Sequence, residues 1–230
     1  MDHFNYRNGQ LYAEDVSVAE IATSVGTPFY VYSTATLVRH FQLFDDALDG
    51  MDHCICYAMK AASNQAILKT LGNLGAGMDV VSGGEYRRAL SAGIPPEKVV
   101  FSGVGKTLEE ITLALKNGIR QFNVESDSEL EQISSIASSM DKIAPIAVRI
   151  NPDVDAQTHE KIATGKAENK FGIPLSRARE VYSKASQMPG INIAVSYTHL
   201  RAHETDLEPF KKAYQKLADL TQLLRQDGHK

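Results

Sequence analysis

The stretch His53-Cys-Ile-Cys-Tyr-Ala-Met-Lys60-Ala-Ala-Ser-Asn64 decides the fold. Apolar residues occupy both alternating sets of positions up to Met59, which is typical of a strand buried on both faces of a parallel sheet. Lys60 follows at the carboxyl end, where α/β folds open into their sites. A desolvated amine there would lose its proton more easily and could attack an aldehyde. From these residues alone, a lysine that reaches back to solvent is the simpler interpretation.

The composition is that of an ordinary globular protein. The chain has 230 residues, of which 43% are hydrophobic and 23% charged, with a net charge of −4. The start shows no secretory signal and no apolar run could span a membrane, so we expect a cytoplasmic protein. The negative charge argues against a nucleic-acid partner. Cys54 and Cys56 are poorly placed for a disulfide and are expected to be core residues in a reducing compartment.

Strand and helix patterns alternate along the chain, which predicts parallel βαβ units. Beyond the strand before Lys60, strands are expected at Phe29–Ser33, Met78–Val81, Val99–Ser102, Gln121–Val124, Ile146–Ile150 and from Ile191. About six of these belong to one sheet that begins with the Lys60 strand. Capping-box patterns at Thr107–Glu110 and Ser126–Glu129 mark two helix starts.

Four segments together resemble one enzyme family. Tyr57-Ala-Met-Lys60-Ala61 is similar to the cofactor-lysine motif of the pyridoxal-phosphate decarboxylases that have an alanine-racemase-like barrel. The segments Phe101–Thr107, Arg149–Asp153 and Thr164–Ile173 resemble the diaminopimelate decarboxylases in particular. The likeness runs from Tyr12 to Lys230 with one gap. The family usually has Asn where this chain has Ala62, a difference that bears on local hydrogen bonding.

The resemblance implies an α/β fold, a (β/α)8 TIM barrel that here is truncated after about six strands and lacks a C-terminal β-domain. Residues 1–33 would form an N-terminal segment whose strand joins that β-domain, and residues 34–230 the incomplete barrel. The implied enzyme is a carboxy-lyase that uses pyridoxal 5'-phosphate to convert the amino-acid substrate meso-diaminopimelate to L-lysine, as a homodimer. Lys60 would hold the cofactor. We expect the chain by itself to be inactive and poorly stable.

Two further side chains are candidates for the site. Asp79 ends a strand before a two-glycine turn and could hold the charge of a lysine, or it could simply cap a helix. Arg149 ends an apolar strand and suits an anionic phenolate or carboxylate, with a structural ion pair as the alternative. The resemblance implies that Asp79 and Arg149 line the cofactor ring. The polar stretch Lys161–Lys170 is either a lid or a solvated loop.

Other interpretations are open to test. Gly103–Thr107 is similar to the tail of a nucleotide-binding loop, but Val100 stands where that loop needs a glycine, so a strand-to-helix turn is favoured. Within enzymes, the substrate could be ornithine, arginine or a carboxylated polyamine, against which Thr164–Ile173 argues. A non-catalytic single-domain cofactor-binding barrel would need a complete barrel with its own glycine-rich loop.

Residues 195–205, Val-Ser-Tyr-Thr-His-Leu-Arg-Ala-His-Glu-Thr, depart from the family. His199 and His203 are four apart, but they lack the His-Glu-x-x-His order and a third ligand, so no metal is predicted. His199 stands where the family has a histidine that stacks on the cofactor ring. The family's small and polar residues after it are replaced by Arg201 and Ala202. The peptide also resembles the translation of a common transposase sequencing adapter, which gives the hypothesis of a replacement by misassembly.

The adapter hypothesis predicts a different DNA sequence at these codons. Because the length of the chain is preserved, the original codons should encode a family-like segment of equal length. Reading the source DNA across codons 195–205 by an adapter-free method checks this. Recovery of the same codons from the organism would end the hypothesis.

Overall fold

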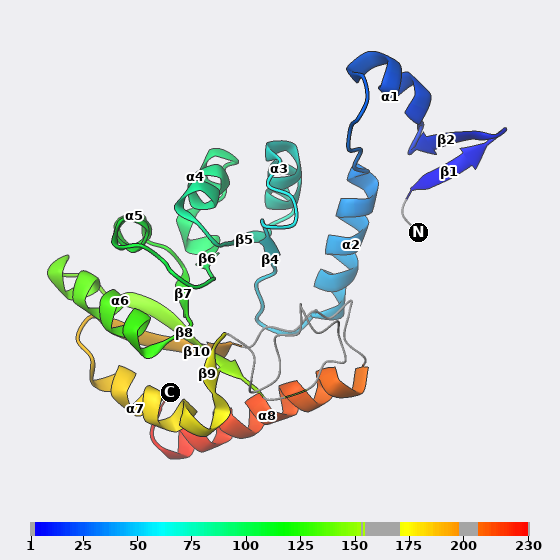
Figure 1. The fold of residues 1–230 in the computed structure, drawn as a ribbon. Helices are drawn as coiled ribbons and strands as arrows, with labels where there is room; N and C mark the ends of the chain where they lie inside the picture. The colour runs from blue at the N-terminus through cyan, green and yellow to red at the C-terminus, as the bar shows by residue number, and fades with distance from the viewer. Residues whose placement is uncertain (1–2, 153, 155–170, 198–206, 230) are drawn as a thin grey trace.

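The computed structural model describes residues 3–152, 154, 171–197 and 207–229. Its centre is a curved parallel sheet whose strands follow one another in space as they do in the chain (Figure 1). The strands are β4 (Cys56–Ala58), β5 (Gly77–Val80), β6 (Val99–Phe101), β7 (Gln121–Val124), β8 (Ala144–Asn151) and β10 (Ile191–Tyr197). The short β9 (Ile173–Pro174) pairs with the end of β8. The predicted count of about six barrel strands is confirmed.

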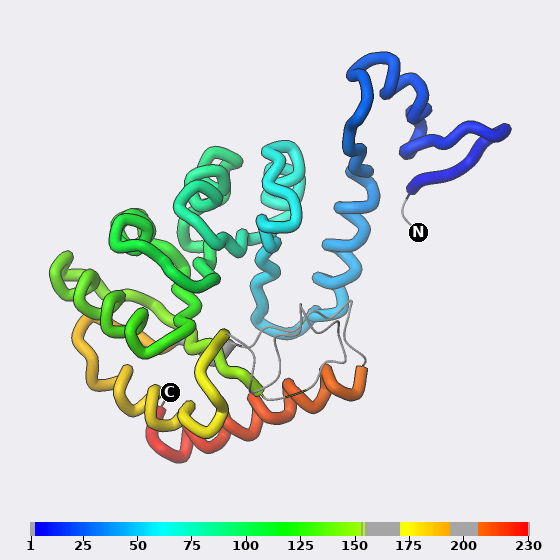
Figure 2. The backbone as a smooth tube through the Cα atoms, viewed as in Figure 1, coloured from blue at the N-terminus to red at the C-terminus, as the bar shows by residue number. Residues whose placement is uncertain are grey.

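Helices follow the strands and cover one side of the sheet. They are α3 (Gln65–Asn73), α4 (Gly83–Ser91), α5 (Leu108–Asn117), α6 (Asp127–Ser139), α7 (Ala178–Gln187) and α8 (Leu207–Gln226), with 3-10 turns η1 (Pro96–Lys98) and η2 (Leu175–Arg177). The smooth trace shows α3 to α7 along the outside of the arc that the strands form (Figure 2). This alternation is the βαβ arrangement that the sequence predicted. No helix in the described part of the chain is long and apolar enough to cross a membrane.

The two faces of the sheet differ in chemistry. Val80, Phe101 and Phe122 belong to the buried cluster beneath the helices, and the two phenylalanine rings stack with centroids 6.2 Å apart. Side chains alternate between faces along each strand. Asp79 and Asn123, which are sequence neighbours of Val80 and Phe122, therefore point to the opposite face. The helix side is an apolar core, and the other side is polar near the carboxyl ends of the strands.

The turn after β6 is built as the sequence indicated. Gly103 and Gly105 have φ of 88° and 72°, a conformation that glycine adopts without strain. Thr107 then caps α5 in a complete capping box with Glu110. The Glu110 carboxylate also accepts a hydrogen bond of 2.7 Å from the backbone N–H of Gly83. This side chain therefore ties the start of α4 to the start of α5.

The second predicted capping box is only half correct. The Ser126 hydroxyl accepts a hydrogen bond from the N–H of Glu129, as expected, at 3.3 Å. The Glu129 carboxylate does not return to the backbone of Ser126. It accepts from the N–H of Glu125 at 2.8 Å and pairs with the Lys106 ammonium. The Glu129 carboxylate pairs with the buried Lys106 ammonium because a charge-assisted hydrogen bond is stronger than the local cap.

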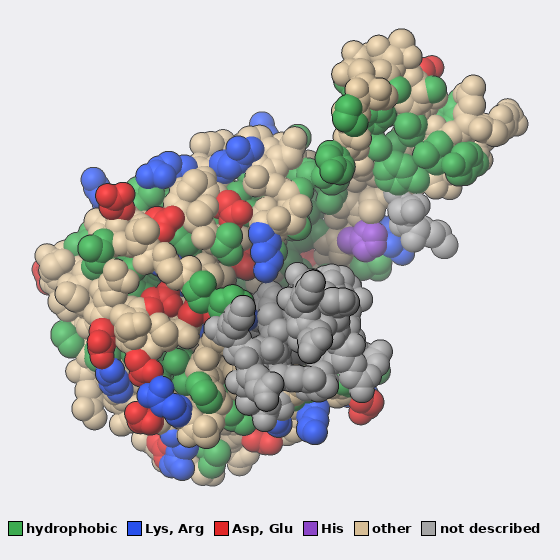
Figure 3. Space-filling model, viewed as in Figure 1, with side chains coloured by type: hydrophobic (Ala, Val, Ile, Leu, Met, Phe, Trp, Pro, Cys, Tyr) green, Lys and Arg blue, Asp and Glu red, His purple; other side chains and the backbone are tan. Residues whose placement is uncertain are grey.

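The N-terminal part was not predicted in detail. Strands β1 (Phe4–Arg7), β2 (Gln10–Ala13) and β3 (Val16–Ser17) form an antiparallel sheet, followed by α1 (Val18–Val25) and α2 (Thr34–Ala47). The segment Phe29–Ser33 is not a strand in the described chain and pairs with none there; its pairing with a β-domain stays a prediction. Tyr30 of this segment is 90% exposed. Figure 3 shows apolar side chains on this part, which stands out from the sheet and its helices.

The strand before Lys60 is shorter than predicted. Regular pairing covers only Cys56–Ala58, and these residues are half-buried rather than enclosed on both sides. In the described residues β4 has a strand neighbour, β5, on one side only. Cys54 and Cys56 are unbonded, with their sulfur atoms 3.8 Å apart. Burial raises the pKa of the Cys56 thiol to about 12, so it behaves as a packing residue.

The capping box of α5 gives a stability prediction. Thr107→Ala removes the hydroxyl that accepts the Glu110 N–H, so we expect a loss of about 1 kcal/mol in the free energy of unfolding. Thr112→Ala on the same helix is the matched control, because the Thr112 hydroxyl only donates back to the Leu108 carbonyl. That change should stay within about 0.5 kcal/mol. Urea unfolding followed by circular dichroism measures both, and equal losses would contradict the role of the cap.

Candidate active site

Lys60 lies in the turn that follows β4, at the carboxyl edge of the sheet. The turn is fixed by the N–H of Met59, which donates to the Asp79 carbonyl at 3.0 Å, and by the Tyr57 hydroxyl, which donates to the Ala62 carbonyl at 3.2 Å. Lys60 itself is exposed and makes no hydrogen bond or ion pair with any described residue. The amine is accessible, which agrees with the simpler interpretation from the sequence, a lysine that reaches back to solvent, and not with a desolvated amine.

Asp79 is the titratable group beside that amine. Its carboxylate accepts a short hydrogen bond of 2.5 Å from the Ser102 hydroxyl. Burial raises the pKa of Asp79, while the Ser102 hydrogen bond and the positive charge of Lys60 lower it, and the balance remains upward. Asp79 is thus a carboxyl group that holds its proton more strongly than an exposed one, next to an accessible lysine.

A line of polar side chains continues from Asp79 across the sheet. The Ser102 hydroxyl also accepts from the side-chain amide of Asn123 at 2.8 Å. The Asn123 side-chain oxygen in turn accepts from Gln121 at 2.9 Å. Asp79, Ser102 and Asn123 stand at or near the carboxyl ends of neighbouring strands, β5, β6 and β7. Parallel pairing of these strands brings them together, although 23 residues separate the first two in the chain and 21 the second two.

Arg149 reaches the same edge from β8 and is 9% exposed. Its Nη1 donates to both carboxylate oxygens of Glu125, at 3.0 and 2.8 Å. The guanidinium lies 5.5 Å from the ring centroid of Phe171, and Gly172, with φ of 88°, packs its backbone on the arginine stem. The ion pair that was the alternative interpretation of Arg149 is therefore present. Arg149 stands two residues after Ala147 on β8, and Ala147 pairs in register with Asn123 of β7.

Several members of this edge were missed by sequence reasoning. Ser102, Asn123 and Glu125 each lie at or just after a strand end, which is the signal that could have identified them. Lys106 was considered only as part of a nucleotide loop, yet its ammonium is buried against protein oxygens. Glu85, the other carboxylate near Asp79 in the chain, is a cap, because it accepts the N–H of Val81 at 2.8 Å.

Two other sequence candidates cannot be placed. His199 and the polar stretch Lys161–Lys170 lie outside the described residues. Only the end of the family-like segment Thr164–Ile173 is described, and there Phe171 touches Arg149. Among the described residues no group of three or more metal-ligating side chains comes together.

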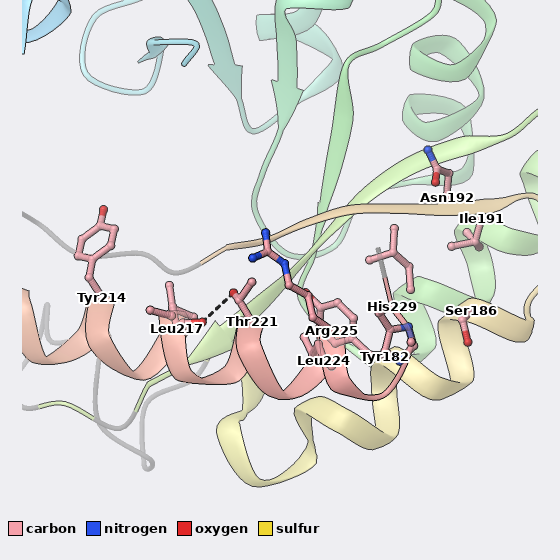
Figure 4. A pocket seen from close by; sticks show the side chains of 13 residues that line it. Tyr182, Ser186, Ile191, Asn192, Tyr214, Leu217, Thr221, Leu224, Arg225 and His229 are labelled. Carbon is pink, nitrogen blue, oxygen red and sulfur yellow. Dashed lines mark hydrogen bonds between the residues drawn. The ribbon is translucent and has the colours of Figure 1, made fainter. Parts of the chain in front are cut away.

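A cavity of about 820 Å³ lies elsewhere, between α8, α7 and β10. Tyr214, Leu217 and Leu224 of α8 face Tyr182 and Ile191 across it (Figure 4). It contains none of Lys60, Asp79 or Arg149. Its lining is mainly aliphatic and aromatic and has no accessible lysine, so it lacks the chemistry of the carboxyl edge.

The donor set at the carboxyl edge fits the aldehyde and ring of a pyridoxal group. Lys60 supplies an accessible primary amine, and such an amine can bind an aldehyde carbon. Asp79 supplies a carboxyl whose pKa burial raises, and Arg149 supplies a fixed guanidinium. Both groups can interact with the polar substituents of an aromatic ring. The edge therefore has the groups that such a cofactor requires at its reactive end.

The fold and this edge define an open (β/α)8-type barrel with a lysine-based site at the carboxyl ends of its strands. Residues 34–230 match the family model described as pyridoxal-dependent decarboxylase, pyridoxal binding domain. The chain belongs to this family, and its fold is the alanine-racemase-like barrel over six strands.

Individual relatives that this chain resembles include diaminopimelate decarboxylases. The chain is 50% identical to the diaminopimelate decarboxylase of Haemophilus influenzae over 228 residues, 99% of this chain and 55% of that protein. The corresponding enzyme of Vibrio cholerae is 48% identical over 229 residues, with the same coverage. A crystal structure of diaminopimelate decarboxylase from Helicobacter pylori with L-lysine superposes with a TM-score of 0.88 at 42% identity, covering 92% of this chain and 54% of that one. The chain thus spans about half the length of the relatives it matches.

Asp79 gives a prediction on pH and stability. Its folded pKa is raised, so the folded state binds the proton more tightly than the unfolded state, and stability falls as the pH rises through the folded pKa. Asp79→Asn removes this titration while keeping an acceptor for Ser102. The variant should be more stable than the unchanged chain at neutral pH. The difference should vanish at a pH below the ordinary value of 3.8, where the carboxyl is protonated in both states.

Asp227→Asn is the matched control with the opposite sign. The Arg179 side chain donates hydrogen bonds to Asp227 and lowers its pKa, so this charged carboxylate stabilises the fold above its unfolded pKa. Replacing it should therefore lose stability at neutral pH, and that loss should also fade in acid. Urea midpoints of both variants across the pH range measure this. A loss of stability for Asp79→Asn at neutral pH would contradict the assignment.

Proposed function

We propose that this chain is the cofactor-binding part of a decarboxylase that uses pyridoxal 5'-phosphate to convert meso-diaminopimelate to L-lysine. The observation that carries the proposal is the accessible Lys60 amine at the end of β4, beside the raised-pKa carboxyl of Asp79. The identity of 50% to a diaminopimelate decarboxylase supports the substrate. The solved relative that holds L-lysine supports the product.

When bound, pyridoxal phosphate supplies an aldehyde for amines and a ring that takes up the electron pair left by departing CO2. The residues of this chain prepare the site for that chemistry. The Lys60 amine would hold the aldehyde group of the bound cofactor. Burial raises the pKa of the Asp79 carboxyl, on which the charge of Lys60 acts, and the Ser102 hydroxyl orients that carboxyl by donating a hydrogen bond of 2.5 Å.

Arg149 and Glu125 form the other wall of the proposed site. Their two hydrogen bonds fix the guanidinium plane, and Phe171 covers one side of it at 5.5 Å. An arginine held in this way offers N–H groups in a set direction to the oxygen atoms of a ring or carboxylate. We include His199 in the proposed cofactor site on its position in the family pattern alone.

The proposal extends to the organisation of the protein. We infer that residues 34–230 are the cofactor-binding barrel and that residues 1–33 are a separate N-terminal segment. In that segment Tyr30 is 90% exposed and Tyr32 is 51% exposed. We infer that these aromatic side chains are covered in a larger assembly. We also propose a homodimer in the cytoplasm, acting on a small amino acid and without nucleic-acid or membrane partners.

A completed enzyme tests the function. It joins residues 1–230, with 195–205 replaced by the matching segment of the Haemophilus influenzae relative, to the part of that relative that follows its matched region. We expect it to release CO2 from meso-diaminopimelate and, after borohydride reduction, to carry the cofactor on Lys60. Lys60→Met should lower turnover on the order of 10³-fold or more.

Lys69→Met is the control for that substitution, since Lys69 is an exposed lysine on α3 away from the site. It should keep turnover within about twofold. Peptide mapping that places the label on Lys106 would overturn the assignment of Lys60. Turnover of ornithine or arginine in preference to meso-diaminopimelate would overturn the proposed substrate, with the intact relative as the positive control.

A further inference from the structure

Lys106 and Glu129 form a charged pair buried behind the proposed site. Their side chains are 1% and 8% exposed, and the proposed chemistry assigns neither of them a step. We propose that they are a positioning pair, which fixes Glu125 and through it sets the direction of the Arg149 guanidinium. This inference rests on the proposed function, because Arg149 matters only if the carboxyl edge binds the cofactor.

The Lys106 ammonium is completely paired. Its three N–H groups have three acceptors: the Gly103 carbonyl at 2.7 Å, the Asn123 carbonyl at 2.8 Å and the Glu129 carboxylate. These acceptors come from the turn after β6, from β7 and from the start of α6. One side chain therefore joins three consecutive parts of the carboxyl edge.

Glu129 passes this constraint to Glu125. Its second oxygen accepts the backbone N–H of Glu125 at 2.8 Å. The Glu125 carboxylate accepts the N–H of Gly103 at 3.2 Å, and Gly103 is the residue whose carbonyl binds Lys106. The four residues form a closed ring of hydrogen bonds. Glu125 is held in it at both its backbone and its side chain.

Arg149 is the point where this ring meets the site. Glu125 follows β7 directly and begins the loop to α6, so its position depends on what holds the loop. Both carboxylate oxygens of Glu125 accept hydrogen bonds from Arg149 Nη1. A shift of Glu125 would therefore turn the guanidinium. Lys106 lies on the far side, with its Nζ 5.8 Å from the centroid of Phe101, a residue of the helix-facing core. Its hydrogen bonds reach the site only through other residues, and its charge also has a lowering effect on the pKa of Asp79.

A purely structural role predicts something different. A buried ion pair can usually be replaced by two apolar residues of similar volume without loss of stability, because the desolvation of both charges is avoided. If the pair only filled space, such a replacement would leave the site unaffected. If the pair positions Glu125, the same replacement keeps the fold but loosens Arg149.

The test measures the affinity of the completed enzyme, prepared without cofactor, for pyridoxal phosphate by absorbance titration. The double variant Lys106→Met with Glu129→Leu removes both charges together and leaves no unpaired ion. We expect its Kd to rise about tenfold, within the range for coupled residues of one network. Thermal melting should show a cooperative transition close to that of the unchanged enzyme.

A cycle with Arg149→Met separates positioning from general damage. In that background, removing the Lys106–Glu129 pair should weaken binding less than about twofold, because the residue it positions is absent. Equal losses in the two backgrounds would overturn the proposal. Lys184→Met with Glu131→Leu is the matched control, since this pair joins α6 to α7 at 2.6 Å on the surface, and it should change Kd in neither background.

A milder variant covers the case in which the first does not fold. Lys106→Met with Glu129→Gln keeps an acceptor for the Glu125 N–H, so we expect a loss of about threefold that again disappears with Arg149→Met. A loss of equal size in both backgrounds counts against the proposal here too. If the unchanged completed enzyme does not take up cofactor on Lys60, the proposed function fails and this inference fails with it. Uptake together with an additive cycle overturns the inference alone.

Discussion

The pairing of the buried Lys106 ammonium is the constraint on which the carboxyl edge of this molecule depends. An ammonium removed from water is tolerated only when its donors are all satisfied. The three N–H donors of Lys106 are accepted by a carbonyl from the turn after β6, a carbonyl from β7 and a carboxylate from α6. Because these acceptors belong to separate βα units, the charge cannot be buried unless the units are in register. Correct assembly of the sheet and correct placement of the edge are thus one requirement.

The same strands serve two environments because their side chains alternate. Along β7, Phe122 and Val124 are buried in the helix-facing core, while Asn123 between them carries a hydrogen bond to Ser102 on the other face. A one-residue slip would put the amide in the core and a phenyl ring at the edge. The apolar core therefore fixes the register, and the register brings the polar residues near the carboxyl ends of neighbouring strands to one edge of the sheet.

The alternating apolar patterns were enough to predict the parallel sheet, most of its strands and the cap of α5. These features were predictable because they depend on residues that are close together in the chain. Lys60, Asp79 and Arg149 were also identified as candidates, because strand-end polar residues stand out in an apolar pattern. What the sequence could not show was pairing. The bonds from Glu125 to Arg149 and from Lys106 to Glu129 cross 24 and 23 residues and exist only once the strands are in register.

The errors have physical reasons of the same kind. Glu129 has the spacing of a capping box, but a buried cation offers its carboxylate a stronger partner than the Ser126 backbone does. Phe29–Ser33 has strand-forming residues, but a strand needs a neighbour to pair with, and none of the described strands pairs with this segment. In both cases the local sequence favours one structure, but the presence or absence of a partner far away in the chain decides which structure forms.

The two lysines at this edge differ in burial, and burial divides their roles. The desolvated lysine is Lys106, whose three N–H donors are all engaged by protein oxygens. Lys60 is exposed, and its positive charge acts on Asp79, whose pKa burial raises. Its accessibility beside this carboxyl is the reason for proposing Lys60, and not Lys106, as the reactive amine. Burial at this edge fixes the position of Lys106, and the side chain that burial does not reach is the one left accessible to a ligand.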